Sequence, residues 1–280
     1  MVPEVVGSNP IDRPSFHLRE LHLPIPTGAA KSAAIMHGFA NPARFLRLAR
    51  WLTPIVLIGG LLVTAGALAF GLFVAPPERL QGETVRIMFI HVPVAWLGMA
   101  GWMGIAAASF TQIVWRHPLA DIAARAIAVP GAIYTAICLV SGSLWGRPAW
   151  GVWWVWDGRL TSFLVLLFLY FGYMALSDAA RGADGGQSRV PAIFGLVGAV
   201  NIPIIHYSVL WWNSQHQPPS ITLGRSAMDA VFLWPLLAAT FGLTLIFAAV
   251  VLMRMRAILA DHQADARLRR KATAEATAHA

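Results

Sequence analysis

Long apolar stretches separated by short charged segments dominate the chain from about residue 51 to residue 253. Each stretch holds few or no charged residues, and most reach the roughly 20 residues that a helix needs to cross a bilayer. Six stretches stand out, at about 51–74, 88–114, 126–146, 160–177, 190–212 and 229–253. The pattern predicts an all-α fold, a polytopic membrane bundle of about six transmembrane helices with both termini on the same side.

The segments outside these stretches divide the chain into three parts. Residues 1–43 are polar and contain several prolines, without the compact apolar core of a signal peptide, and are expected to form a mobile N-terminal arm. Residues 44–256 are expected to form the membrane domain, and residues 257–280 a cytoplasmic C-terminal tail. The composition agrees, because only 12% of the residues are charged, about half the share found in soluble globular proteins.

The positive charge of the chain is better explained by membrane topology than by nucleic acid. A net charge of +8 suggests nucleic-acid binding, but such proteins concentrate their charge on a polar domain, which is missing here. The loops after the first, third and fifth stretches contain five of the 21 Lys and Arg residues, namely Arg79, Arg86, Arg147, Arg159 and Arg225. The positive-inside rule therefore predicts cytoplasmic termini, with loops 75–87, 147–159 and 213–228 facing outward.

Two histidines are expected at the outward face of the membrane. His91 opens the second stretch and His206 lies near the end of the fifth, so both imidazoles should lie at a similar depth. Ionisable groups inside a membrane are commonly functional, although structural, hydrogen-bonded histidines are the alternative interpretation. Pro93 and Pro203 lie close to these histidines, and we interpret them as kinks that aim the imidazoles. The third outward histidine, His216, is expected to be a loop residue or part of a surface for partners.

Tryptophan is concentrated on the same side. Five of the 12 tryptophans fall within a loop that is expected to span residues 145–161: Trp145, Trp150, Trp153, Trp154 and Trp156. An aromatic belt would occupy both membrane faces, yet the inward side has little beyond Trp51 and Trp115. The one-sided enrichment favours a large flat ligand, an amphipathic macrocycle whose disc is covered by indoles and whose metal is bound by two imidazoles.

Four charged residues around the loop are further candidates for contact with such a ligand. Arg147 and Arg159 bracket the tryptophans, and Arg86 precedes His91 by about one turn. These arginines are candidate partners for the acidic groups of the ligand, with ordinary interfacial charge as the alternative. Asp157 is expected either to orient the loop, by accepting a bond from the loop backbone or from Arg159, or to contact the ligand directly.

Three segments together resemble the haem exporter protein C family, also called the cytochrome c maturation protein C family. The segment WGVWWVWDGRLT at 150–161 resembles the tryptophan-rich WWD signature of haem-handling membrane proteins. The segments RIMFIHVPVAW at 86–96 and NIPIIHYSVLWWN at 201–213 resemble the two histidine segments of the family. The resemblance covers about residues 50–256, with the six stretches in the order of the family, and leaves the N-terminal arm unmatched.

The resemblance implies a haem-binding protein of c-type cytochrome biogenesis, without enzymatic activity of its own, in the bacterial inner membrane with the tryptophan loop at the periplasmic face. His91 and His206 would be the axial iron ligands of a transiently bound haem b, resting on a platform of tryptophans: Trp150, Trp153, Trp154 and Trp156. The implied partners are the ATPase and membrane subunits of an ABC transporter, a small single-span protein and a periplasmic haem chaperone, cytochrome c maturation protein E. The chain would present haem so that a histidine of the chaperone bonds to a haem vinyl group.

Other functions stay open at this stage. A transporter that moves haem through its own bundle would need polar residues along the helices, and Asn201 is nearly alone there. A haem lyase of the wider WWD group is typically larger and has additional histidines. An electron-transfer subunit with haems across the bilayer would need four buried histidines at two depths. One departure from the expected family pattern is Leu210, where we expect an acidic residue.

Overall fold

The structure is a computed structural model that describes residues 41–184, 188–212, 214–216, 221–222 and 225–278. The predicted N-terminal arm, residues 1–43, therefore lies almost wholly outside the described residues. Six helices in the described part of the chain are long and apolar enough to cross a membrane: Pro42–Val74, Glu83–Trp115, Ala120–Trp150, Gly158–Arg181, Val190–Trp211 and Ala230–Thr277. The predicted six-span helical membrane bundle is confirmed, while the orientation of its termini stays a prediction.

These spans are built from nine helical elements, and two short strands lie between the last two spans. In chain order the helical elements are α2 (Pro42–Ala69), the π-helical turn η1 (Phe70–Val74), the 3-10 helix η2 (Glu83–Ile87), α3 (Met88–Trp115), α4 (Ala120–Trp150), α5 (Gly158–Asp184), α6 (Val190–Gly198), α7 (Asn201–Trp211) and α8 (Ala230–Ala278). Strands β1 (Ile221–Thr222) and β2 (Arg225–Ser226) pair antiparallel. Helix α8 includes most of the predicted tail 257–280, because that segment is rich in good helix formers and has no Pro or Gly.

The fifth span is broken into α6 and α7 close to Pro203. Pro203 has no backbone N–H, and its ring conflicts with the carbonyl four residues earlier, that of Ala199. At the break the backbone forms hydrogen bonds to the residue three positions earlier, as in a 3-10 helix. Val200 N–H donates to Val197 O at 3.2 Å, and Ile202 N–H donates to Ala199 O at 3.1 Å. Pro93, by contrast, lies inside the continuous helix α3. Whether the two prolines aim the imidazoles stays a prediction.

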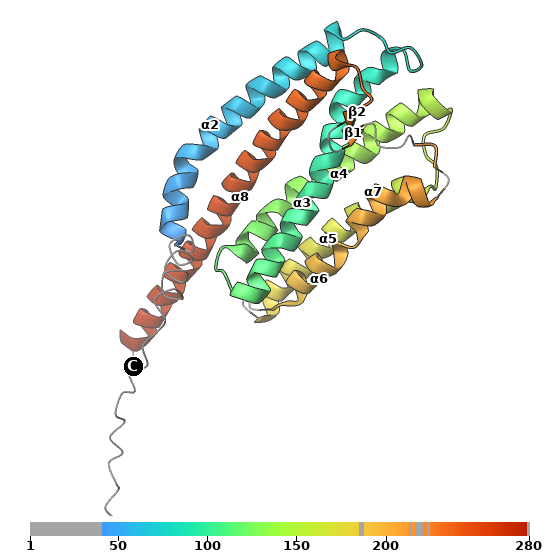
Figure 1. The fold of residues 1–280 in the computed structure, drawn as a ribbon. Helices are drawn as coiled ribbons and strands as arrows, with labels where there is room; N and C mark the ends of the chain where they lie inside the picture. The colour runs from blue at the N-terminus through green and yellow to red at the C-terminus, as the bar shows by residue number, and fades with distance from the viewer. Residues whose placement is uncertain (1–40, 185–187, 213, 217–220, 223–224, 279–280) are drawn as a thin grey trace, which may run out of the picture. The chain divides into compact units, whose positions relative to one another are not determined.

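Helices α3 and α4 form the middle of the bundle. Helix α8 packs against both of them and also runs alongside α2, whereas α5, α6 and α7 cover the other side (Figure 1). The turn between η1 and η2, the connection between α4 and α5, and the end of α7 lie at one end of the bundle (Figure 1). This end carries most of the tryptophans and is called the tryptophan end below. The α3–α4 turn, the start of α2 and the polar part of α8 lie at the other end.

Glycines allow α2 and α8 to approach closely. A Cβ atom added to Gly60 of α2 would lie 2.9 Å from the backbone nitrogen of Ile246 in α8. A Cβ atom added to Gly242 of α8 would clash with the hydroxyl of Thr64. Small residues of this kind are the usual means by which helices pack in a membrane, where lipid tails remove the hydrophobic driving force.

Aromatic side chains fill the centre of the bundle. Trp102 of α3 is fully buried, and its ring lies edge-on to Tyr170 at 5.0 Å and to Tyr173 at 6.3 Å between ring centroids. The Tyr170 hydroxyl donates a 2.7 Å hydrogen bond to the carbonyl of Gly98, so the polar tip of this buried ring is satisfied. These rings pack against one another between α3 and α5 in the centre of the bundle.

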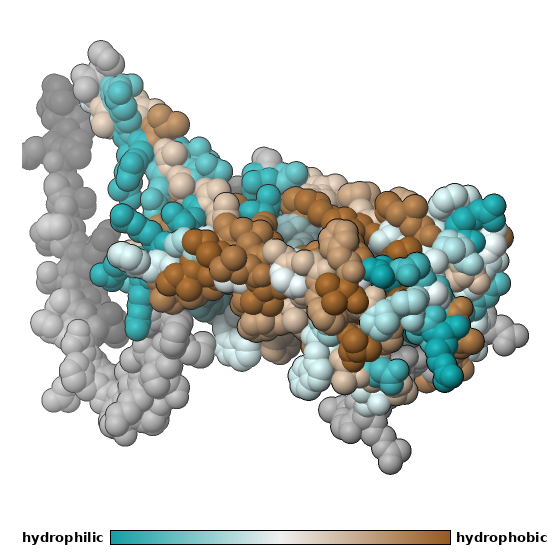
Figure 2. Space-filling model, turned by 90° about the horizontal axis from the view of Figure 1, so that it is seen from above, coloured by the Kyte–Doolittle hydropathy of each residue, from teal (hydrophilic) through white to brown (hydrophobic). Residues whose placement is uncertain are grey.

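The outer surface of the spans is apolar. Large hydrophobic side chains are strongly exposed on several helices, among them Leu62, Phe73, Trp96, Phe168, Val197 and Phe241. Figure 2 shows apolar residues across the middle of one face and hydrophilic residues at both of its ends. Such a band is expected for helices whose outer faces contact lipid.

Candidate functional site

The tryptophan-rich segment is more helical than the sequence indicates. Helix α4 continues to Trp150 and α5 begins at Gly158, so only residues 151–157 of the predicted loop 145–161 lie between helices. The end of α4 is closed by Gly151, whose φ of 80° is left-handed and whose N–H donates to Arg147 O at 3.0 Å. The preceding turn is held by Trp145, whose indole N–H donates to Gln81 Oε1 at 3.1 Å. The loop is therefore short and fixed at its start.

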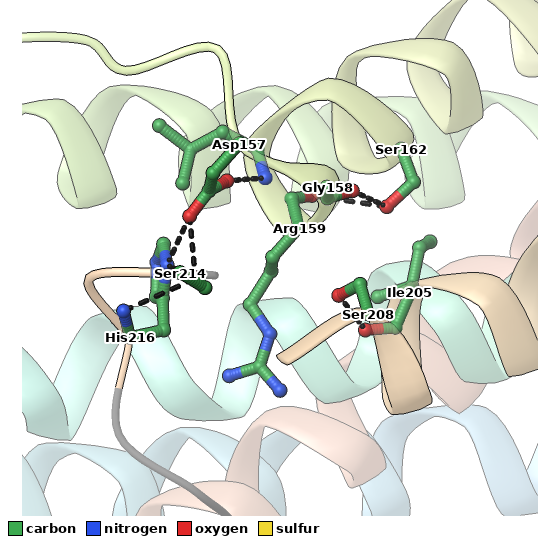
Figure 3. Close-up of polar contacts among 9 residues, drawn as sticks. Asp157, Gly158, Arg159, Ser162, Ile205, Ser208, Ser214 and His216 are labelled. Carbon is green, nitrogen blue, oxygen red and sulfur yellow. Dashed lines mark hydrogen bonds and ion pairs between the residues drawn. The ribbon is translucent and has the colours of Figure 1, made fainter. Parts of the chain in front are cut away.

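Asp157 fixes the other end of the loop. One oxygen of its carboxylate, Oδ1, accepts the backbone N–H of Leu160 at 2.8 Å and so caps the start of α5. The other oxygen, Oδ2, accepts from Ser214 Oγ at 2.6 Å and from His216 Nδ1 at 2.9 Å (Figure 3). Asp157 is only 7% exposed. A single carboxylate thus connects the tryptophan loop, the first turn of α5 and the segment that follows α7.

The hydrogen bonds keep Asp157 ionised. Burial raises the pKa of its carboxyl, but the bonds from Ser214, Leu160 and His216 outweigh burial, and the pKa lies below its usual value. Burial lowers the pKa of His216, and the nearby Asp157 carboxylate opposes this only in part. At neutral pH the pair therefore consists of a carboxylate and a neutral imidazole that donates from Nδ1.

His216 belongs to this site, which the sequence pattern does not indicate. Besides bonding to Asp157, its ring lies edge-on to Trp150 with 4.7 Å between ring centroids. It is therefore held against the loop, although the sequence predicts a loop residue or a surface for partners. The two bonded residues are 59 positions apart, and no local spacing rule joins them.

His91 is held by α4 through a hydrogen bond to Ser141. Its Nδ1 lies 3.0 Å from Ser141 Oγ, and that hydroxyl donates its own proton to the carbonyl of Ile137 at 2.7 Å. With the Ser141 proton on this carbonyl, the Ser141 oxygen accepts from His91, an arrangement in which Nδ1 carries the proton and Nε2 keeps its lone pair. Helix α4 packs closely on the ring, since a Cβ atom on Gly142 would lie 2.9 Å from His91 Cε1. The ring is also edge-on to Trp145, with 5.7 Å between ring centroids.

His206 is less enclosed. It lies on α7, is exposed, and its ring is edge-on to Tyr207 at 4.8 Å between ring centroids. Among the residues that the structure describes, no hydrogen bond or ring contact joins His206 to His91. The described residues also contain no group of three or more His, Cys, Asp or Glu side chains arranged for a metal ion. Joint iron ligation by the two histidines therefore stays a prediction.

The tryptophans of the loop present an open aromatic surface. Trp153 and Trp156 are 56% and 74% exposed, and Trp156 lies edge-on to Trp154 with 5.5 Å between ring centroids. Ser143 of α4 donates to the carbonyl of Trp153 at 2.5 Å, which fixes the middle of the loop. The indole N–H of Trp154 is buried and has no hydrogen-bond partner within the described part of the chain. The surface thus presents the exposed rings of Trp153 and Trp156, and the unpaired donor of Trp154 lies buried beneath it.

Arg159 is a cation beside the loop that has no protein partner among the described residues. Its side chain extends away from Asp157 (Figure 3), and its guanidinium forms no hydrogen bond or ion pair with any residue that the structure describes. It lies within electrostatic range of both His91 and His216. Arg159 is therefore available to an anionic group that approaches His91 or the tryptophans.

The other two predicted arginines already have protein partners. Arg147 donates to the carbonyl of Gly151 and so takes part in the end of α4. Arg86 donates to the carbonyl of Leu72 in η1 and forms an ion pair with Glu83, with 2.5 Å between Arg86 Nε and Glu83 Oε2. Both help to shape the tryptophan end, and neither has the free guanidinium of Arg159.

The fold and this site define a class: a six-span membrane protein with a histidine and a surface of tryptophans at one end of the bundle. Residues 35–270 match the family model described as Heme exporter protein C. Among curated relatives with that name, the protein of Bradyrhizobium diazoefficiens is 48% identical over 225 residues, covering 78% of this chain and 82% of the relative. The Escherichia coli (strain K12) protein is 42% identical over 226 residues, covering 80% of this chain and 90% of the relative. The chain belongs to the Heme exporter protein C family.

Proposed function

We propose that this chain handles haem in c-type cytochrome biogenesis: it holds haem at the tryptophan end and delivers it to the periplasmic haem chaperone, cytochrome c maturation protein E. The name of the relatives, Heme exporter protein C, supports haem as the cargo. In this proposal the chain acts in transport and assembly and catalyses no reaction of its own. The positive-inside pattern supports a periplasmic location of the tryptophan end in a bacterial inner membrane.

The observation that carries the proposal is the state of His91. Its Nδ1–H is bonded to Ser141, so its Nε2 lone pair is free to ligate iron. Two imidazoles suffice only for an iron that brings its own equatorial ligands, as haem does. We propose His206 as the second axial ligand. Bis-histidine ligation of a transiently bound haem b leaves no open iron position for oxygen chemistry, which suits a carrier.

The loop supplies the remaining contacts in this proposal. The exposed rings of Trp153 and Trp156 cover the apolar disc of the macrocycle, with Trp150 and Trp154 behind them. The guanidinium of Arg159 matches the carboxylates of the haem propionates. Arg86, Arg147 and Asp157 act mainly by keeping the loop and the neighbouring helix ends in place.

The partners follow from the same proposal. Haem is presented at an open surface, and the buried, contacting rings of Trp102 and Tyr170 support presentation over passage through the bundle. ATP hydrolysis belongs to the ATPase subunit of an ABC transporter, which would assemble with its membrane subunit and a small single-span protein around the chain. The open tryptophan surface leaves room for the chaperone to reach a haem vinyl group.

The experiment that tests the proposal is a haem transfer assay. The purified full chain is loaded with haem and mixed with the apo chaperone, and covalently bound haem on the chaperone is measured. Wild type and Trp51→Ala, which alters an exposed residue remote from the loop, should transfer haem equally. His91→Ala should transfer much less. Equal transfer by His91→Ala and wild type would refute the proposal.

A further inference from the structure

A second polar site lies at the end of the bundle opposite the tryptophans. A cavity of about 180 Å³ lies between α4, α5 and α8. Its polar lining consists of three arginines, one aspartate and two hydroxyl groups, namely Arg125, Arg181, Arg254, Asp178, Tyr173 and Ser177. None of these residues takes part in the proposed haem site, and a cluster of guanidinium groups between transmembrane helices calls for an explanation of its own.

Arg125 of α4 is the most deeply buried of these cations. The residue is 8% exposed, and its Nε lies 3.0 Å from the carboxylate of Asp121. Its Nη2 donates toward His262 Nε2 at 3.2 Å. Its third nitrogen, Nη1, is buried and has no partner among the residues that the structure describes. Because a buried cationic N–H without an acceptor is costly, Arg125 is well suited to a ligand that brings an acceptor into the cavity.

The other two arginines leave the cavity with an excess of positive charge. Arg181 of α5 forms an ion pair with Asp178. Arg254 of α8 uses Nε to donate to the carbonyl of Ala126 at 3.0 Å, and its Nη groups have no protein partner within the described residues. The described groups around the cavity therefore include three guanidinium groups but only two carboxylates, those of Asp121 and Asp178. An anion would balance this charge.

We propose that this cavity binds a phosphate group, either that of an anionic phospholipid or free phosphate. Guanidinium groups match phosphate oxygens in geometry and charge, and the Tyr173 and Ser177 hydroxyls add possible donors. The cavity is several times the roughly 30 Å³ that one water occupies, which gives a phosphate group enough room. Arg125 and Arg181 lie near the ends of their spans, and Arg254 directly follows the apolar stretch 229–253 of α8. This is the level where basic pockets between transmembrane helices bind lipid headgroups.

The test uses the purified full chain and two phosphate sources. Native mass spectrometry measures retention of phosphatidylglycerol against phosphatidylcholine, and thermal unfolding in detergent is followed while inorganic phosphate is added. Arg254→Gln removes one lining cation with little change in size, and Arg125→Gln removes the buried one. Arg256→Gln is the matched control, because Arg256 lies on the same helix but outside the lining of this cavity.

Phosphatidylglycerol should bind about tenfold more weakly to Arg254→Gln than to wild type. A loss of this size is typical of one charge-assisted hydrogen bond. Arg256→Gln should bind like wild type. Stabilisation by inorganic phosphate, together with displacement of the lipid, would identify the phosphate group itself as the ligand. Lipid binding without any response to inorganic phosphate would identify the phospholipid. Equal losses in Arg254→Gln and Arg256→Gln, or no binding of either source to wild type, would overturn the proposal.

Discussion

The carboxylate of Asp157 accepts a hydrogen bond from His216 Nδ1 at 2.9 Å, although the two residues are 59 positions apart. Asp157 follows the tryptophans of the loop directly, whereas His216 lies a few residues after α7, the helix that carries His206. The position of the tryptophan surface is therefore coupled to the end of α7. Under the proposed function, this bond keeps the tryptophan platform and the candidate iron ligand His206 in a fixed relative position.

Replacing Asp157 should separate its two roles. Asp157→Ala removes both the cap of α5 and the acceptor for Ser214 and His216, and should lower the free energy of unfolding by about 1–2 kcal/mol. Asp157→Asn keeps an oxygen for the cap and should unfold closer to wild type. Both variants should retain less haem during purification, measured as the ratio of haem to protein. Asp265→Asn, an exposed change on α8, is the control. Full haem retention by Asp157→Asn would show that the bond does not position the platform.

The stability that His216 contributes to the folded chain should fall on acidification. Because the pKa of folded His216 lies below its ordinary value, the unfolded chain takes up a proton first as pH falls below about 6.5, and stability is lost from there. The contribution of Asp157, whose pKa is also lowered, is present above about pH 3.9 and is lost only as pH falls through its folded pKa. As pH falls, the stability contributed by His216 should therefore be lost before that contributed by Asp157.

Thermal unfolding of wild type and His216→Gln at two pH values checks this order. At pH 7.5 the variant should be less stable by about 1 kcal/mol, the usual value of one lost hydrogen bond. At pH 5.5 the difference should shrink, because protonated His216 no longer favours the folded wild type. A difference that grows on acidification would mean that the pKa of folded His216 is raised, contrary to the structure.

Ser141 should control haem affinity through His91. Ser141→Ala removes the acceptor of the His91 Nδ1–H bond, so the ring loses its fixed tautomer and orientation. Loss of such a supporting bond typically weakens metal binding by about 10–100-fold, which a haem titration followed by absorbance measures. Ser141→Thr, which keeps the hydroxyl, should restore most of the affinity. Ser109→Ala, another buried serine remote from His91, should have no effect. Unchanged affinity in Ser141→Ala would exclude this role.

The tryptophans of the loop should matter more for haem than tryptophans elsewhere. Replacing Trp153 and Trp154 by Ala removes apolar surface and the unused indole donor, and should reduce haem retention severalfold. The matched control replaces Trp51 and Trp115, which are also exposed. The measurement is the haem content of each double variant after the same purification. Equal losses in the two pairs would favour an aromatic belt over a haem platform.

The sequence predicts the fold better than the site. Six uninterrupted apolar stretches are a strong signal for spans, so their number and order follow directly from it. The extent of the loop is harder to predict, because α4 continues to Trp150 and Trp145 in its last turns bonds to Gln81, 64 residues away. The role of Arg86 is also hard to predict. Its position in the sequence suggests a contact with the ligand, but in the fold its guanidinium donates to the carbonyl of Leu72. Such bonds depend on tertiary structure, and local patterns do not contain them.

Axial ligation of iron by His91 and His206 is tested most directly by the absorption spectrum of haem bound to the purified chain. Wild type should give a low-spin, six-coordinate spectrum, because two neutral imidazoles complete the coordination of the iron. His91→Ala combined with His206→Ala should abolish this spectrum while circular dichroism still shows a helical fold. An unchanged low-spin spectrum in the double variant would contradict axial ligation by these two histidines.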